Sequence, residues 1–242
     1  MKVLILGAGP ATIDGHDYPI WLAEHGGELL VERVARTCSS IEGAELVFAV
    51  REQDIRRHHI SNVVELAVPG ARVVQVRGTT AGAACTALLA IAHIDPAEEL
   101  LILNANEFIN QDYGAILRGF QARGLDGGVA VFPSLHPRYS YVRLDADELV
   151  VEAAEKRPIS RNATVGFYWY RRGGDFVAAA QRMIRKDAQV EGVFYICPVF
   201  NEMVLNQAKI GIHRLPLDHY HPVKSAMQAE RYAAAPFPEE TT

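Results

Sequence analysis

The chain has 242 residues, of which 49% are hydrophobic, and its formal net charge at pH 7 is −5. This length and apolar content are sufficient for one sizeable hydrophobic core. A negative net charge with dispersed basic residues argues against a nucleic-acid-binding protein, and no apolar run is long enough to span a membrane.

The three cysteines stand far apart, without the CxxC spacing of a redox or metal-binding motif. Each lies among apolar or small residues, so we expect buried free thiols, the usual state in a reducing cytoplasm. These features predict a soluble, cytoplasmic protein.

Strands and helices are predicted to alternate through the first half of the chain. Apolar runs predict five strands, at Lys2–Leu6, Glu45–Val50, Ala71–Val76, Glu99–Leu103 and Val129–Phe132. Amphipathic or alanine-rich segments predict the helices between them, at Glu28–Cys38, from Arg51, up to about His93, and at Tyr113–Arg123. The alternation predicts a mostly parallel α/β sheet flanked by helices, with right-handed crossovers.

The second half is predicted to add antiparallel strands. Tyr141–Leu144 and Glu148–Ala153 read as the two arms of a hairpin, and Ala163–Tyr170 has the β-branched and aromatic residues of a strand. Further elements are predicted as helices at Asp175–Lys186 and Met203–Ala208 and a last strand at Lys209–Leu215. We expect one α/β domain at residues 1–225 and a C-terminal tail at residues 226–242.

Two glycine-containing segments follow predicted strands and are candidates for contact with a phosphate or a flat ligand. The segment Gly7–Gly9 offers exposed amides to which a phosphate can come close. It lacks the third glycine of a Rossmann fingerprint, so a plain strand-to-loop turn stays open as the alternative. The segment around Gly82 leads into a helix whose first amides can face a flat ligand, with tight helix packing as the alternative.

A charged cluster lies between two strand-like segments in residues 150–170. Glu155, Lys156 and Arg157 are followed by Pro158, which blocks helix continuation. A solvated turn would account for such a cluster alone. The order VEAAEKRPIS followed by ATVGFYWY resembles the Glu-Lys-Pro segment of sugar-phosphate nucleotidylyltransferases, which precedes a strand with an internal glycine.

The resemblance implies a single-domain, Rossmann-like sheet of the GT-A type and roles for several residues. Glu155 would contact a sugar hydroxyl, and Lys156 would bind the acceptor phosphate. Asn106 and Asn201 would hold Mg²⁺ or another divalent cation, with Glu107 assisting. The nucleoside triphosphate would lie against five small residues, with its phosphates near Gly7, Ala8 and Gly9 and its base near Gly82 and Ala83.

The chain departs from the family at three charged positions. No arginine lies between Gly7 and Tyr18, Ile20 replaces a lysine, and Asn106 replaces the metal-binding aspartate. We expect Arg138 and Arg161 to supply the missing positive charge.

We therefore predict a divergent nucleotidylyltransferase that couples a nucleoside triphosphate to a sugar phosphate, or to a similar phosphorylated small molecule, for surface-polysaccharide synthesis. A GT-A glycosyltransferase that uses a nucleotide sugar is one alternative, for which Asp145-Ala146-Asp147 has the expected spacing. A non-catalytic nucleotide- or sugar-binding relative is the other. The expected partners are the nucleotide and the phosphorylated small molecule, and the sequence leaves a homo-oligomer open.

Overall fold

The computed structural model of the chain describes residues 1–9, 19–25 and 27–234. Within them, the main sheet has nine strands, and β1 (Lys2–Leu6) lies inside its parallel half. β1 pairs in parallel with β4 (Glu45–Arg51) on one side and with β6 (Leu100–Asn104) on the other. β5 (Arg72–Val76) extends the parallel edge beyond β4. The first four predicted strands are thus confirmed as a parallel sheet.

The remaining strands of the sheet are joined to this parallel half through one antiparallel strand, β11 (Asn162–Tyr170). β11 runs antiparallel between β6 and β8 (Gly127–Pro133), and β12 (Ile210–Arg214) pairs in parallel with β8. A hairpin of β9 (Ser140–Leu144) and β10 (Val150–Glu155) joins β11 through β9. The predicted α/β fold with an antiparallel addition is confirmed, but β8 does not lie beside β6, because the later strand β11 occupies that place.

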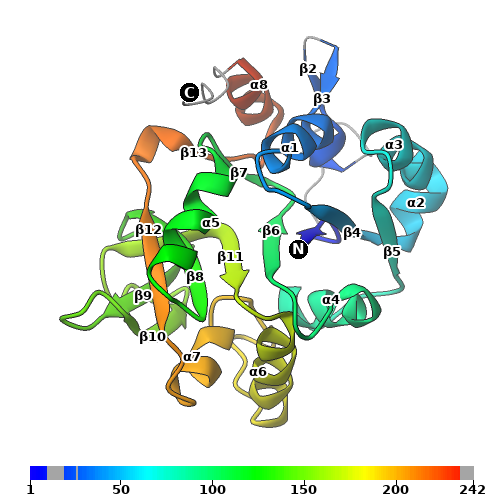
Figure 1. Ribbon diagram of the computed structural model, residues 1–242. Helices are drawn as coiled ribbons and strands as arrows, with labels where there is room; N and C mark the ends of the chain where they lie inside the picture. The colour runs from blue at the N-terminus through cyan, green and yellow to red at the C-terminus, as the bar shows by residue number, and fades with distance from the viewer. Residues whose placement is uncertain (10–18, 26, 235–242) are drawn as a thin grey trace.

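Helices cover both faces of the sheet (Figure 1). Alternate side chains of β1 point to opposite faces, so that Val3 and Ile5 join one hydrophobic core and Leu4 and Leu6 join the other. The first core includes residues of α1 (Leu30–Cys38), α3 (Ile60–Ala67), α5 (Tyr113–Ala122) and α8 (Ala226–Ala234). The second includes residues of α4 (Ala83–Leu89), α6 (Gly173–Arg185) and α7 (Val199–Val204). Burial on both faces explains the unbroken apolar run of β1.

Three predictions differ most from the observed helices, and the bounds of α1, α5 and α6 shift by one or two residues at an end. The helix predicted from Arg51 is two helices, α2 (Glu52–His58) and α3, because His59 between them has a left-handed φ of 50°. α4 ends at Leu89, and a separate 3₁₀ turn at Ile91–His93 follows it. The helix predicted at Met203–Ala208 begins earlier, as α7, and ends at Val204.

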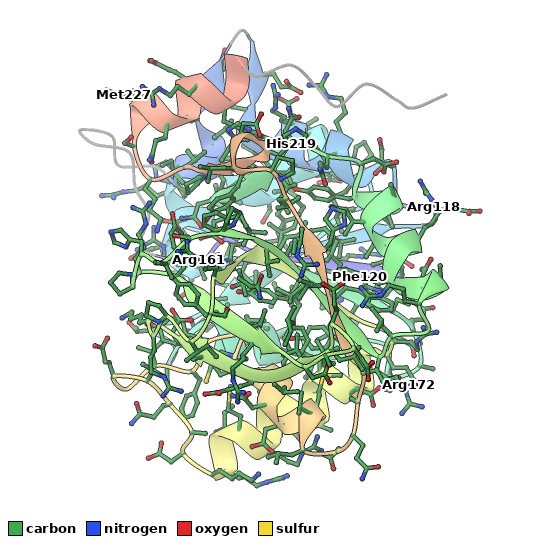
Figure 2. The ribbon with its side chains drawn as sticks, turned by 90° about the vertical axis from the view of Figure 1, so that its left-hand side faces the viewer. Arg118, Phe120, Arg161, Arg172, His219 and Met227 are labelled. Carbon is green, nitrogen blue, oxygen red and sulfur yellow. The ribbon has the colours of Figure 1, made fainter. Side chains whose placement is uncertain are left out.

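Gly127 and Gly128 belong to β8 and not to the turn that a glycine pair before a strand suggests. A Cβ on Gly128 would lie 2.5 Å from the ring of Phe120 on α5. Figure 2 shows Phe120 pointing inward from α5 while Arg118 points outward. The glycines therefore let α5 approach the sheet closely.

Four short strands were not predicted. They form two separate two-stranded sheets, β2 (Glu24–His25) with β3 (Glu28–Leu29), and β7 (Glu107–Ile109) with β13 (Tyr220–Pro222). The second pair matters for the site, because it ties the chain near the C-terminus to the segment after β6. α8 then packs back on the domain, where the Tyr232 ring stacks on Phe108 with centroids 4.4 Å apart.

Two sequence predictions concern burial and membranes. The three cysteines are free, with Cys38 and Cys197 buried and Cys85 half-buried. Burial raises the pKa of the Cys38 thiol to about 12. None of the helices in the described ranges has both the length and the apolar character that a membrane span requires.

Candidate active site

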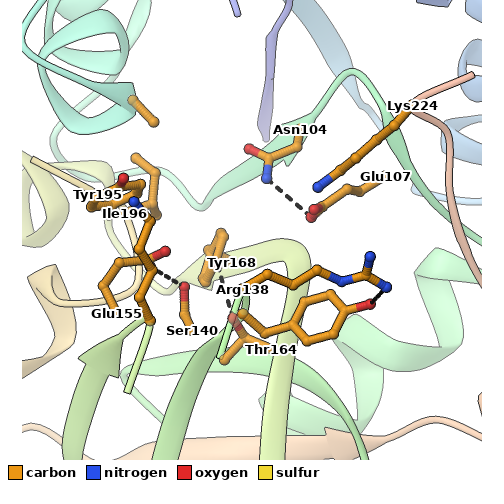
Figure 3. A pocket seen from close by; sticks show the side chains of 13 residues that line it. Asn104, Glu107, Arg138, Ser140, Glu155, Thr164, Tyr168, Tyr195, Ile196 and Lys224 are labelled. Carbon is orange, nitrogen blue, oxygen red and sulfur yellow. Dashed lines mark hydrogen bonds between the residues drawn. The ribbon is translucent and has the colours of Figure 1, made fainter. Parts of the chain in front are cut away.

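A cavity of about 220 Å³ opens where the parallel half of the sheet meets the antiparallel addition (Figure 3). Asn104, the last residue of β6, and Glu107, the first of β7, lie on one side. Ser140 and Glu155, from the two strands of the hairpin, lie on the other. The cavity is thus at the carboxyl end of β6, where ligands of open α/β sheets bind.

Glu155 is a buried carboxylate at the end of β10. It pairs in register with Ser140 on β9, and the Ser140 hydroxyl donates a hydrogen bond to its Oε2. Burial raises the pKa of Glu155, the bond from Ser140 and the charge of Lys156 lower it, and the charge of Glu107 raises it. Glu155 therefore presents a carboxyl group that has lost part of its hydration and can accept a hydrogen bond from a ligand.

Lys156 follows β10 with a left-handed φ of 54°. Its backbone N–H still donates to the Tyr139 carbonyl at 3.0 Å, so the turn away from the hairpin occurs at this residue. Its Nζ lies 2.6 Å from an Oε atom of Glu191 and 5.6 Å from the centroid of the Tyr195 ring. Hydrogen bonds to Glu191 and Tyr195 raise the pKa of Lys156. The Lys156 ammonium is therefore charged, and another anion can take the place of Glu191 beside it.

Gly166 makes room for the opposite wall. A Cβ on this residue of β11 would lie 2.6 Å from the Cβ of Asn104 and 2.6 Å from Oε2 of Glu107. The same Oε2 accepts a hydrogen bond from Asn104 Nδ2 at 3.1 Å. The glycine inside the strand that follows the Glu-Lys cluster thus allows both side chains to reach the cavity.

The structure brings together five of the residues singled out in the sequence. Glu155, Lys156, Arg138, Glu107 and Ala83 all line the cavity. Arg138 lies over the ring of its neighbour Tyr139, with a guanidinium-to-centroid distance of 4.8 Å, and donates to the Tyr139 hydroxyl at 2.6 Å. Chemically, the cavity combines carboxylates that accept hydrogen bonds with cations that attract phosphate.

Three other predicted residues do not line the cavity. Both polar atoms of the Asn201 side chain engage the backbone of Ala153, whose N–H donates to Oδ1 at 2.7 Å and whose carbonyl accepts from Nδ2 at 2.8 Å. Arg161 is exposed after the hairpin (Figure 2). Asn106 uses its carbonyl to accept a hydrogen bond from the N–H of Val223 at 2.8 Å. Asn201, predicted to bind a metal ion, thus uses both polar atoms of its side chain to hold β10 in place.

Of the five residues predicted to contact the nucleotide, Ala83 belongs to the described lining of the cavity, and the other four do not. The Gly7 amide donates to the Ala49 carbonyl at 2.8 Å, and Gly7 is buried whereas Gly9 is exposed. Ala8, between them, is half-buried, and residues 10–18 lie outside the described ranges. Gly82 has a φ of 121°, and a Cβ there would lie 2.5 Å from the carbonyl oxygen of Phe194. The glycine thus permits residues 194–196 to dock beside Ala83.

Sequence reasoning missed several lining residues. They are Asn104, Tyr139, Ser140, Thr164, Tyr168, Tyr195, Ile196 and Lys224. Thr164 and Tyr168 are buried on β11 with their hydroxyl oxygens 3.1 Å apart, and burial raises the pKa of Tyr168. The alternation of β11 could have identified these two, since they share a face. Lys224 had no local signal, because its place depends on the pairing of β13 with β7.

The Asp145-Ala146-Asp147 triplet lies in the hairpin turn and not at the cavity. Oδ1 of Asp145 accepts hydrogen bonds from the N–H groups of Asp147 and Leu149, both at 2.9 Å. This carboxylate therefore closes the turn, and the feature that favoured a glycosyltransferase is absent from the site.

Comparisons with known proteins agree with this geometry. A family model described as nucleotidyl transferase matches residues 25–202, more than half of the chain. A nucleoside-diphosphate-sugar pyrophosphorylase from Vibrio cholerae RC9 has a TM-score of 0.80 at 21% identity, covering 96% of this chain and 100% of that one. A candidate glucose-1-phosphate thymidylyltransferase from Bacillus anthracis, in complex with a sucrose, has a TM-score of 0.73 at 15% identity, covering 98% and 97%. A UDP-glucose pyrophosphorylase complexed with UDP-glucose has a TM-score of 0.70 at 14% identity, covering 95% and 96%.

No curated protein matches the chain. Nucleotidyltransferases of the matched family generally use a nucleoside triphosphate and a divalent metal ion. In this chain, however, the described residues include no group of three or more His, Cys, Asp or Glu that could hold a metal. The extent of the family match decides the assignment. The chain belongs to the nucleotidyl transferase family and is a nucleotidyltransferase enzyme.

Proposed function

We propose that the enzyme transfers a nucleotidyl group from a nucleoside triphosphate to a sugar phosphate, or to a similar phosphorylated small molecule, and releases pyrophosphate. The observation that carries the proposal is the pair formed by Glu155 and Lys156 on the cavity wall. A carboxylate accepts hydrogen bonds from hydroxyls, and an adjacent ammonium neutralises a phosphate. The similar structures, which include a nucleoside-diphosphate-sugar pyrophosphorylase and a UDP-glucose pyrophosphorylase, favour the same substrate class.

The acceptor would lie between the hairpin and the segment that carries Tyr195. Its hydroxyls would donate to Glu155, and its phosphate would take the place of Glu191 on the Lys156 ammonium. Breaking the Lys156–Glu191 ion pair costs little, because both side chains are exposed to solvent, at 40% and 70%. A cavity of about 220 Å³ is smaller than the ~300–1,000 Å³ typical of larger ligands. It suits the acceptor alone, with the nucleotide extending beyond it.

The nucleotide would extend from the cavity toward the end of β1. Its base would lie against Gly82 and Ala83, of which Ala83 lines the cavity. Its phosphates would approach the exposed Gly9 end of the segment formed by Gly7, Ala8 and Gly9. An oxygen of the acceptor phosphate then attacks the α-phosphorus, the bond from that phosphorus to the β-phosphate oxygen breaks, and pyrophosphate leaves with the electron pair. Such a transfer depends on positioning and on charge neutralisation rather than on a covalent enzyme intermediate.

The product would be an activated nucleotide sugar or a related nucleotide conjugate. We assign it to surface-polysaccharide synthesis, and we place the enzyme in the cytoplasm, where nucleoside triphosphates and sugar phosphates are available together. A homo-oligomer is compatible with this assignment.

The test is a pyrophosphate-release assay that crosses five triphosphates (UTP, CTP, dTTP, GTP and ATP) with a panel of sugar phosphates and other phosphorylated small molecules. One pair is expected to give equal amounts of pyrophosphate and of the nucleotide conjugate. Lys156→Met should raise the KM for the acceptor about 10-fold or more, because a charge-assisted contact is lost. It should leave the KM for the triphosphate nearly unchanged.

Lys209→Met is the matched control, because Lys209 is exposed and precedes β12, away from the cavity lining. Transfer or hydrolysis of a ready-made nucleotide sugar, without pyrophosphate release from any triphosphate, would contradict the proposal and favour a glycosyltransferase.

A further inference from the structure

We propose that Lys224 supplies, beside Glu107, the positive charge that a divalent metal ion would otherwise bring, so that the enzyme binds its nucleoside triphosphate without such an ion. This inference rests on the proposed function, since it assumes that a triphosphate enters the site. It addresses a disagreement between the family, whose members generally use a divalent ion, and the residues of this chain.

The backbone fixes Lys224 at the cavity from both sides. β13 runs antiparallel to β7, with Pro222 opposite Glu107. The next residue, Val223, is fully buried and donates its N–H to the Asn106 carbonyl at 2.8 Å. The N–H of Lys224 itself donates to Oε1 of Gln228 on α8 at 2.8 Å. The backbone of Lys224 is therefore held in place, and Figure 3 shows the ammonium of its side chain pointing toward the Glu107 carboxylate.

The ammonium of Lys224 is the cation at the cavity that is most available to a ligand. Lys156 is engaged by Glu191 at 2.6 Å, and Arg138 is engaged by the hydroxyl and the ring of Tyr139. No carboxylate of the described residues forms an ion pair of 4.0 Å or less with Lys224. Lysine binds phosphate as a point charge with three rotatable donors. An incoming triphosphate would thus meet a fixed positive charge here.

The oxygen donors at this end of the cavity do not fit a divalent ion. Mg²⁺ dehydrates reluctantly, and nucleotide sites usually hold it by one or two free carboxylates together with the substrate phosphates. Glu107 is the one carboxylate on this side of the described lining, and its Oε2 already accepts a hydrogen bond from Asn104. The other carboxylate, Glu155, is occupied by Ser140 across the cavity. An ion held by Glu107 would also lie near the Lys224 ammonium, and the two like charges would repel each other.

The experiment measures triphosphate binding by isothermal titration calorimetry, once with EDTA and once with excess MgCl₂. The wild-type enzyme is expected to bind its triphosphate with dissociation constants that agree within about 3-fold in the two buffers. Lys224→Met should raise the dissociation constant in EDTA by about 10- to 100-fold, because one charge-assisted contact to phosphate is lost. Lys209→Met removes an exposed charge elsewhere and should leave the constant unchanged in both buffers.

A second variant tests the same idea in the opposite direction. Lys224→Asp places a second carboxylate beside Glu107 and removes the ammonium that repels a cation. Titration with Mn²⁺, followed by electron paramagnetic resonance, should detect one bound ion in this variant and none in the wild type. Thermal unfolding of each variant verifies that it is folded.

The outcomes separate the inference from the proposed function. Wild-type binding that requires Mg²⁺, or an unchanged affinity in Lys224→Met, would overturn the role of Lys224 while leaving nucleotidyl transfer intact. Absence of binding of all five triphosphates to folded wild-type enzyme in both buffers would overturn both.

Discussion

Replacing Gly166 with alanine should destabilise the fold and displace one wall of the cavity. The added Cβ would lie 2.6 Å from Oε2 of Glu107 and 2.6 Å from the Cβ of Asn104. The carboxylate of Glu107 is the end of a flexible side chain and can rotate away. The Cβ of Asn104 is bonded to the backbone of β6, so it can move only if β6 and β11 separate locally.

The size of the effect follows from this contact. Overpacking a buried site typically costs about 1–3 kcal/mol of unfolding free energy. For a chain of this length, that loss corresponds to a decrease in Tm of roughly 2–12 °C. Asn104 and Glu107 are hydrogen-bonded to each other and line the cavity. Because their displacement changes the cavity wall, the KM for a substrate should rise in the same variant.

Urea unfolding followed by circular dichroism, together with the pyrophosphate-release assay, measures both effects. Gly119→Ala is the matched control, since Gly119 is exposed within α5 and a Cβ there would meet nothing within 4 Å. It should keep or increase stability, by about 0.5–1 kcal/mol, because glycine is unfavourable in a helix. The close approach of β6 to β11 would be refuted by a Gly166→Ala enzyme that unfolds at the wild-type urea concentration with unchanged KM values.

Three further predictions concern Asn201, Glu191 and Glu155. Asn201→Asp should lower the unfolding free energy by about 1–3 kcal/mol, because its carboxylate faces the Ala153 carbonyl; an increase in Mg²⁺ affinity without loss of stability would instead identify a metal ligand. Glu191→Gln should lower the KM for the acceptor by less than about 5-fold, since it frees Lys156 from an exposed ion pair; a higher KM would contradict this exchange. Burial raises the pKa of Glu155 above its ordinary value of 4.5, so the unfolded chain loses this proton first as pH rises. The unfolding free energy of the wild type, measured against Glu155→Gln, should therefore fall as pH rises from 4.5; a difference independent of pH would contradict the burial effect.

Local sequence patterns were sufficient for the elements but not for their order in the sheet. The apolar run of β1 predicted a strand buried on both faces, and its alternate side chains do enter two cores. Nothing local indicated that β11 would lie between β6 and β8, because that choice depends on pairing between residues far apart in the sequence. The place of Gly127 and Gly128 inside β8 was equally hidden, since the ring of Phe120 that requires small residues there comes from another element.

The site shows the same division. Glu155 and Lys156 were singled out by the resemblance of their segment to the Glu-Lys-Pro segment, and both line the cavity, at the end of a hairpin that is local in sequence. Asn201 looked like a metal ligand ahead of a helix, yet its partner Ala153 is 48 residues away on β10. Lys224 is delivered by two three-residue strands that are too short to carry a periodic signal. Long-range pairing therefore explains why sequence reasoning misplaced Asn201 and missed Lys224.

Under the proposed function, the charges of the cavity would favour phosphorylated ligands. Its two carboxylates are each engaged by a neutral group, Glu155 by Ser140 and Glu107 by Asn104, so neither one neutralises a lysine at close range. Lys156 takes its counter-charge from Glu191, whose side chain is 70% exposed. A ligand phosphate can therefore replace Glu191 without leaving a buried charge unpaired, whereas a neutral sugar offers nothing to exchange. Discrimination against unphosphorylated acceptors then follows from where the counter-charges lie, and it does not require a tight fit around the sugar.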